Sequence, residues 1–123
     1  MNYTEAQQDV LSSLGEGCSA ASLLDAWSAF VLEVEEGYAW DESEYRNEVR
    51  VRGQIELVME AESLQKFVEH REFRENVQRV DSQFLSSSHP TWKFPWGGTW
   101  WESAVPVSSR GDFAECYRRF GFT

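Results

Sequence analysis

Apolar residues recur at three- and four-residue intervals along most of the chain, which is the spacing of one face of an α-helix. The clearest stripe predicts a helix from Ser19 to Glu36, with Gly37 in the position of a left-handed C-terminal cap. The inward residues of this helix are predicted to be Leu23, Trp27, Phe30, Val31 and Val34.

The same spacing predicts helices before and after this segment. An N-terminal helix begins at a capping box of residues 4–7, with Thr4 as the cap, and ends at the glycines of residues 15–17. A third helix begins after Asp41, runs to about residue 61 and bends near Gly53. Ser63 is predicted to cap a short helix, followed by a break near residues 70–72, and a last helix begins at Asp112. Between the break and the stop at residues 86–90 lies another apolar stripe, made of Phe73, Val77, Val80 and Phe84.

Residues 91–101, TWKFPWGGTWW, carry five large aromatic side chains in eleven positions. Pro95 and the Gly97–Gly98 pair prevent a regular helix through this segment. Five rings left in water would form an exposed apolar patch that promotes aggregation, so we predict that most of them pack across the helices and that one or two stay at the surface. No alternating pattern predicts a strand. The sequence therefore predicts an all-α fold: a compact bundle of about five helices in a single domain, residues 1–123, crossed by the Trp-rich segment.

The charge of the chain narrows the possible partners. The 123 residues carry a net charge of −10, with 41% hydrophobic and 26% charged residues, as in soluble globular domains. Residues 1–62 contain 14 Asp/Glu and 3 Lys/Arg, a net −11, whereas residues 63–123 contain 7 and 8, a net +1. A negative field of this size repels nucleic acids and anionic membranes and attracts basic proteins. We therefore expect a basic protein partner, contacted by the first half of the chain.

Catalytic signatures are scarce. The two histidines lack the Glu-x-x-His spacing of di-metal bundles, and we find no phosphate-binding loop and no dinucleotide fingerprint. We expect no enzyme activity, no metal and no cofactor. The alternative is a small enzyme with Cys18 as nucleophile, since a helix N-terminus lowers the pKa of a thiol. With no long apolar run and no basic leader, we expect a cytoplasmic protein in which Cys18 and Cys116 are free thiols.

The best binding candidate is the junction between the second and third predicted helices, residues 33–45. Its acids would steer and orient a basic partner, and its aromatic rings would anchor that partner at low entropy cost. The open alternative is a solvated helix face, with the aromatic side chains fixing the turn to the core. The candidate binding residues are Glu33, Glu35, Glu36, Tyr38, Trp40, Asp41, Glu42 and Glu44.

Three stretches of the second and third helices share a pattern with known proteins: Trp27-x-x-Phe30-Val31-x-x-Val34-Glu35-x-Gly37-Tyr38, Tyr45-Arg46-Asn47 and Arg50-Val51-Arg52. Two later stretches add to it: Val80-Asp81-x-x-Phe84 and Trp100-Trp101-Glu102-x-x-Val105-Pro106. With these residues the chain resembles small acidic bacterial helical proteins, among them immunity proteins and inhibitors encoded beside toxins. Such proteins are not catalysts. They place carboxylates and aromatic rings over a basic active site and exclude its substrate.

This resemblance implies that the six acids of the junction steer a toxin or nuclease and that Tyr38 and Trp40 anchor it. Two further alternatives remain open beside the Cys18 enzyme. The protein could be a phage-type inhibitor or DNA mimic, although the nearly neutral second half disfavours a long row of phosphate-like acids. It could also be a structural subunit whose Trp-rich segment forms an oligomer interface.

Overall fold

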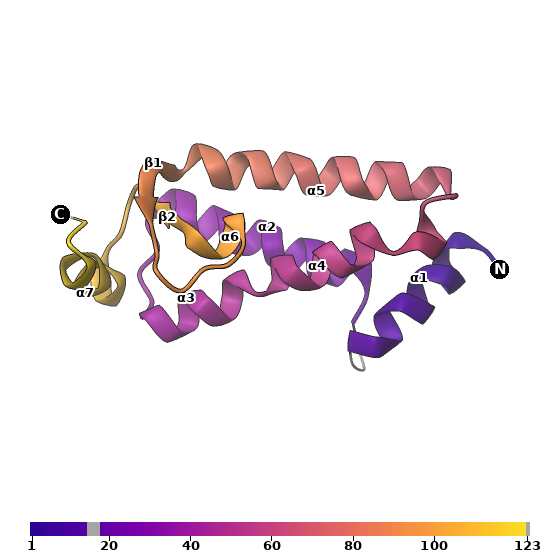
Figure 1. Cartoon of the computed structure of the whole chain (residues 1–123), viewed down its shortest axis with the longest axis horizontal. Coiled ribbons are helices and arrows are strands. Elements are labelled where there is room, and N and C mark those ends of the chain that lie inside the picture. Colours follow the sequence, from indigo (N-terminus) through magenta and orange to yellow (C-terminus); the bar gives the residue numbers. More distant parts are fainter. Residues whose placement is uncertain (15–17, 123) are drawn as a thin grey trace.

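Three helical rods run lengthwise beside one another in the computed structural model, which describes residues 1–14 and 18–122 (Figure 1). They are α2 (Ala20–Glu36), α5 (Val68–Ser86) and the consecutive pair α3 (Glu42–Val49) and α4 (Val51–Glu60). Helix α1 (Tyr3–Leu11) covers one end of the rods, and α7 (Gly111–Phe120) covers the other end. The chain is mostly helical, as predicted.

A small antiparallel sheet accompanies the helices, which the all-α prediction missed. Strand β1 (Ser88–Lys93) pairs with β2 (Ala104–Pro106), with Ser88 opposite Pro106, Lys93 opposite Ala104 and an irregularity between them. Pro90 and the absence of an alternating burial pattern in β1 hid this strand from a pattern search. The short helix α6 (Trp100–Ser103) leads directly into β2, so the Trp-rich segment is a strand, a loop and a helical turn.

The observed helix boundaries agree with the predicted ones where the sequence has a clear capping residue. Helix α2 begins after Ser19, whose hydroxyl accepts from Ser22 N at 3.0 Å, and ends at Gly37, whose φ is 97°. The Asp41 carboxylate likewise accepts from Glu44 N at 2.9 Å and opens α3. These contacts satisfy backbone N–H groups that a helix start leaves free.

Other boundaries differ from prediction. The first cap is Asn2, whose side chain accepts from Glu5 N at 2.8 Å, and not Thr4. The predicted end at residues 15–17 lies outside the described residues. The bend of the third helix is a turn at Arg50 rather than at Gly53. Ser63 does not cap a helix but lies inside a 3-10 turn, Glu62–Leu64.

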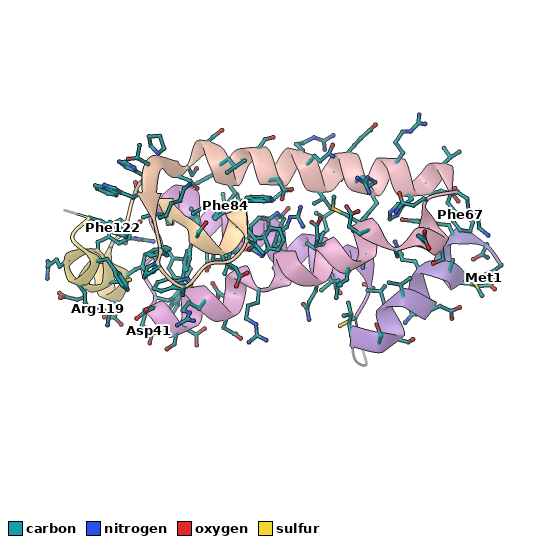
Figure 2. All side chains as sticks on the ribbon, in the orientation of Figure 1. Met1, Asp41, Phe67, Phe84, Arg119 and Phe122 are labelled. Carbon is teal, nitrogen blue, oxygen red and sulfur yellow. The ribbon has the colours of Figure 1, made fainter. Side chains whose placement is uncertain are left out.

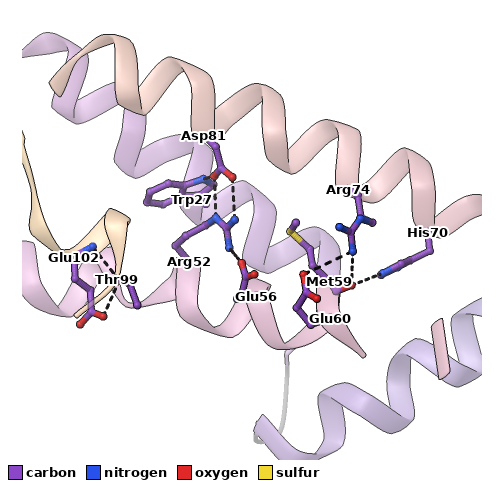
Figure 3. Close-up of polar contacts among 10 residues, drawn as sticks. All are labelled: Trp27, Arg52, Glu56, Met59, Glu60, His70, Arg74, Asp81, Thr99 and Glu102. Atoms are coloured by element: carbon purple, nitrogen blue, oxygen red, sulfur yellow. Dashed lines mark hydrogen bonds and ion pairs between the residues drawn. The ribbon is translucent and has the colours of Figure 1, made fainter. Parts of the chain in front are cut away.

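Helix α5 shows no break near residues 70–72, contrary to prediction. His70 is 1% exposed and extends the apolar stripe of this helix by one turn toward its start. One ring nitrogen lies 3.0 Å from the Met59 carbonyl oxygen (Figure 3), and the other lies 2.9 Å from Tyr3 Oη. These contacts tie α5 to α4 and α1. A polar residue in a core position interrupts the hydrophobic pattern without interrupting the helix, because its polar atoms find partners.

The Trp-rich segment lies mostly against the helices, as predicted. Phe94 and Trp101 are buried, Trp92 and Trp96 are half-buried, and Trp100 is 39% exposed. Figure 2 shows a dense group of aromatic side chains between this segment, α3 and α7. The group continues into the helices, because Tyr45 stacks on Phe113 with ring centroids 4.7 Å apart. The segment therefore fills the space at one end of the rods.

Candidate protein-binding surface

The residues predicted to bind a partner lie around the connection between α2 and α3, but they do not all face solvent. Glu35, Glu36 and Glu44 are exposed, and Trp40 is 59% exposed. Leu32, missed by the sequence analysis, is 54% exposed and lies one helical turn before Glu35 and Glu36 on α2. We call Leu32, Glu35, Glu36, Trp40 and Glu44 the acidic junction.

The connection that carries Trp40 is held by the C-terminal part of the chain. Arg110 donates from Nε to the Gly37 carbonyl oxygen at 2.7 Å and from its backbone N to the Tyr38 carbonyl oxygen at 3.0 Å. Asp112 N donates to the Ala39 carbonyl oxygen at 3.1 Å. Because residues 110–112 hold the backbone of residues 37–39, the connection presents Trp40 from a defined position.

Tyr38 does not belong to the exposed surface, which corrects its predicted role as a surface anchor. Its side chain is 0% exposed, and its ring centroid lies 5.1 Å from that of Phe113 on α7. The hydroxyl donates to Glu48 Oε2 at 2.7 Å. Burial, together with the hydrogen bond and the charge of Glu48, raises the pKa of Tyr38 well above its ordinary value. Tyr38 therefore joins α2 to α3 and α7 as a core residue.

Asp41 and Glu42 are occupied by contacts within the chain. Asp41 caps α3, as described above, and Glu42 forms an ion pair with Arg119 of α7. Figure 2 shows Asp41 and Arg119 at the same end of the molecule. This pairing explains why the charge asymmetry of the sequence overstates the free acidity of the first half: the fold brings arginines of the second half to it. By contrast, within the described part of the chain, no salt bridge involves Glu35, Glu36 or Glu44.

Glu33 lines a groove between α2, the α3–α4 rod and α6. The groove has a volume of about 810 Å³. Its apolar lining comes from Ala26, Ala29, Phe30, Val51, Leu57 and Trp101. Its charged lining comes from Glu33, Glu48 and Glu102, with Arg50 as the one cation among the lining residues. The sequence analysis selected Glu33 but did not foresee the groove, because its two walls come from helices whose relative position no local pattern specifies.

The negative charge of Glu33 acts on the Glu48 carboxyl of this groove. Burial raises the pKa of the Glu48 carboxyl, the hydrogen bond from Tyr38 opposes this rise, and the negative charge of Glu33 adds to it. The charged form of Glu48 is thus less favourable in the folded protein than in water. A cation placed beside Glu33 and Glu48 would offset both the burial and the repulsion.

Cys18, the candidate nucleophile, lies just before the start of α2. Cys18 is half-buried against the core, next to the Ser19 cap, and no hydrogen bond joins it to a histidine in the described residues. His89 stacks on Trp92 with centroids 3.9 Å apart. Residues 1–14 and 18–122 contain no group of three or more His, Cys, Asp or Glu placed to hold a metal ion. Of the helices described, none is both long enough and apolar enough to cross a membrane.

Comparison with known proteins adds no further constraint. The sequence matches no protein-family model, and no match was found among the curated proteins or the solved structures. The evidence on function is therefore the surface and the groove themselves.

Proposed function

We propose that the protein is a small acidic binding protein that inhibits or neutralises a basic protein partner, such as a toxin or nuclease, in the manner of immunity-type proteins. The observation that carries this proposal is the acidic junction, where three exposed carboxylates without salt bridges among the described residues adjoin exposed Leu32 and Trp40. Large apolar side chains next to free charges are typical of interface hot spots with a charged rim.

In this proposal, the helices form a compact bundle in the cytoplasm that serves as a rigid scaffold rather than as a catalytic framework. Carboxylates attract and orient the partner over several ångströms, and the tryptophan supplies contact area at a small entropy cost. A nuclease or another toxin that acts on a polyanion needs a basic active site, which would match this surface. Binding there would exclude the substrate without any chemical step.

The experiment is an affinity capture from native lysate at low salt, with matched charge variants. In the test variant, Glu35, Glu36 and Glu44 are replaced by lysine. In the control variant, Glu69, Glu72 and Glu75 of α5 are replaced by lysine, which makes the same change in net charge on three exposed positions and, like the test variant, includes one acid in the first turn of a helix.

We expect the wild type and the control variant to capture the same basic protein and the test variant to lose it. Inhibition of the activity of that protein by the purified chain would complete the assignment. Equal capture by both variants would mean that the acids are a solvated face. If duplex DNA competes for the captured protein and that protein binds DNA, the DNA-mimic alternative would gain support instead.

A further inference from the structure

The groove between α2 and the α3–α4 rod has the lining of a docking site for a short helix. Ala26 and Ala29 project small side chains from α2, and Gly53 has none on the opposite wall. Small side chains let the backbone of a third helix come close to both walls. The lining residues of α2 run from Ala26 to Glu33, which corresponds to about 10 Å along a helix, or about two turns.

The polar groups of the groove select the charge of its occupant. Three carboxylates line it against one arginine, so it favours a cationic ligand. Glu102 is partly engaged, since it accepts from Thr99 Oγ1 at 2.8 Å (Figure 3). Glu48 accepts from Tyr38 through Oε2, and among the described residues no salt bridge involves Glu33, whose carboxyl lies beside that of Glu48. Glu33 and Glu48 are thus the carboxylates with capacity left for a ligand.

The apolar lining sets a second requirement. Leu57 is 57% exposed, and it lies beside the same groove as the ring of Trp101 and the two alanines. Covering this surface removes apolar area from water, which favours an occupant with apolar side chains at helical spacing. A polyamine or a free metal ion would leave the surface uncovered.

We propose that this groove receives an amphipathic basic helical segment of the protein partner, with a lysine or arginine side chain between Glu33 and Glu48 and apolar side chains over Ala26, Ala29 and Leu57. The inference rests on the proposed function and names a second contact for the same partner. The acidic junction attracts the partner, and the groove holds one of its segments.

The test uses the full chain labelled with ¹⁵N and a defined probe: an amidated peptide of lysine and leucine at amphipathic helical spacing. A peptide with glutamate in place of each lysine serves as the charge control. On titration at low salt, we expect saturable shifts of the backbone amides of Ala26, Ala29 and Gly53 with the lysine peptide and no binding of the glutamate peptide. Shifts confined to Glu35, Glu36 and Glu44, or no binding, would overturn the proposal.

Matched variants locate the site. Ala29→Trp fills the groove, whereas Ser28→Trp adds the same side chain at an exposed position of α2 that does not line it. We expect Ala29→Trp to weaken the peptide by about tenfold or more and Ser28→Trp to have little effect, as is typical when a central contact of an interface is blocked. If Ala29→Trp does not fold, the Glu33→Gln variant decides, with about a fivefold loss expected. Unchanged affinity in either folded variant would contradict the groove site.

The outcomes separate this inference from the proposed function. A partner that is lost on Glu35/Glu36/Glu44→Lys but retained by Ala29→Trp would leave the function intact and remove the groove. A lysine peptide that binds in the groove while lysate capture gives no charge-dependent partner would keep the groove and remove the inhibitor assignment.

Discussion

Arg52 and Asp81 form a two-pronged ion pair in the interior, where Arg52 Nε donates to Asp81 Oδ1 at 2.8 Å and Nη2 donates to Asp81 Oδ2 at 2.9 Å (Figure 3). Arg52 is 3% exposed and also donates to Glu56 at 2.7 Å. Trp27 Nε1 donates to the same Asp81 carboxylate at 2.9 Å. The guanidinium carbon also lies 4.9 Å from the centroid of the Trp101 ring. This cluster joins α2, α4, α5 and α6.

Asp81→Ala should therefore be among the most destabilising single substitutions, because it leaves the buried indole N–H of Trp27 without its acceptor and the buried Arg52 with Glu56 alone. We expect a loss of about 3–5 kcal/mol in the free energy of unfolding, measured by urea titration with circular dichroism. The double variant Arg52→Met/Asp81→Leu should be more stable than Asp81→Ala. Arg118→Ala breaks an exposed pair with Glu115 and should cost less than about 0.5 kcal/mol. Equal losses for Asp81→Ala and Arg118→Ala would refute this role of the pair.

Two adjacent glycines of the Trp-rich segment should respond differently to the same substitution. A Cβ at Gly97 would lie 2.4 Å from the Ser103 backbone nitrogen, whereas a Cβ at Gly98 would meet nothing within 4 Å. Gly97→Ala must displace α6 from the loop and should cost about 1–3 kcal/mol. Gly98→Ala should be neutral or slightly stabilising. Thermal unfolding of both variants checks the difference, and similar midpoints would show that the close approach has no energetic consequence.

The raised pKa of Glu48 makes a prediction about pH. Because burial favours the protonated form in the folded state, the stability associated with this group is full below its ordinary pKa of 4.5 and declines as pH rises through the raised value. Glu48→Gln keeps an acceptor for Tyr38 and removes this dependence. The stability of the variant relative to wild type should therefore increase from pH 4 to pH 7, with urea midpoints as the readout. The groups that act on Glu48 are Tyr38 and Glu33, and the other charged residues lining the groove are Arg50 and Glu102. The Glu48→Gln variant keeps all four of these residues. A constant difference across pH would contradict the direction of the shift.

Substitution of Trp40 should weaken binding and leave the stability of the fold almost unchanged. Its side chain is 59% exposed, so Trp40→Ala should change the free energy of unfolding by less than about 0.5 kcal/mol. If the acidic junction binds the partner, the same change should weaken binding by about 2 kcal/mol or more, or about thirtyfold. Leu85→Ala on α5, at a position 51% exposed, is the matched control and should leave binding unchanged. Equal affinity of wild type and Trp40→Ala would remove Trp40 from the interface.

The local signals of the sequence were sufficient to locate the helices wherever a cap and an apolar stripe coincide. Ser19 and Gly37 bound α2 as predicted, and Gly121 ends α7 in the left-handed conformation with φ of 74°. The prediction of a break in α5 was wrong because a histidine was not counted as a core residue. His70 is buried, and both of its ring nitrogens have hydrogen-bond partners. The short strands were missed because their pairing depends on residues far apart in sequence.

The candidate surface was also predictable only in part, because local patterns place some of its residues and distant contacts place the others. The exposure of Glu35 and Glu36 follows from their places on the polar face of the amphipathic helix α2. The burial of Tyr38 and the pairing of Glu42 depend on α7, which lies more than sixty residues later and docks through Phe113 and Arg119. No local pattern contains that information.

The stacked and edge-on rings at one end of the molecule form a continuous series through Trp27, Phe30, Tyr45, Phe113, Phe94, Phe122 and Trp92. Successive centroids are 4.7 to 6.1 Å apart. Rings held at fixed mutual angles couple optically, so the native protein carries its own near-ultraviolet circular dichroism signature of how α2, α3, the Trp-rich segment and α7 are assembled. Loosening of α7 would remove the contributions of Phe113 and Phe122 and so change this signature while the far-ultraviolet helical signal persists. The docking of the last helix is thereby observable without any label.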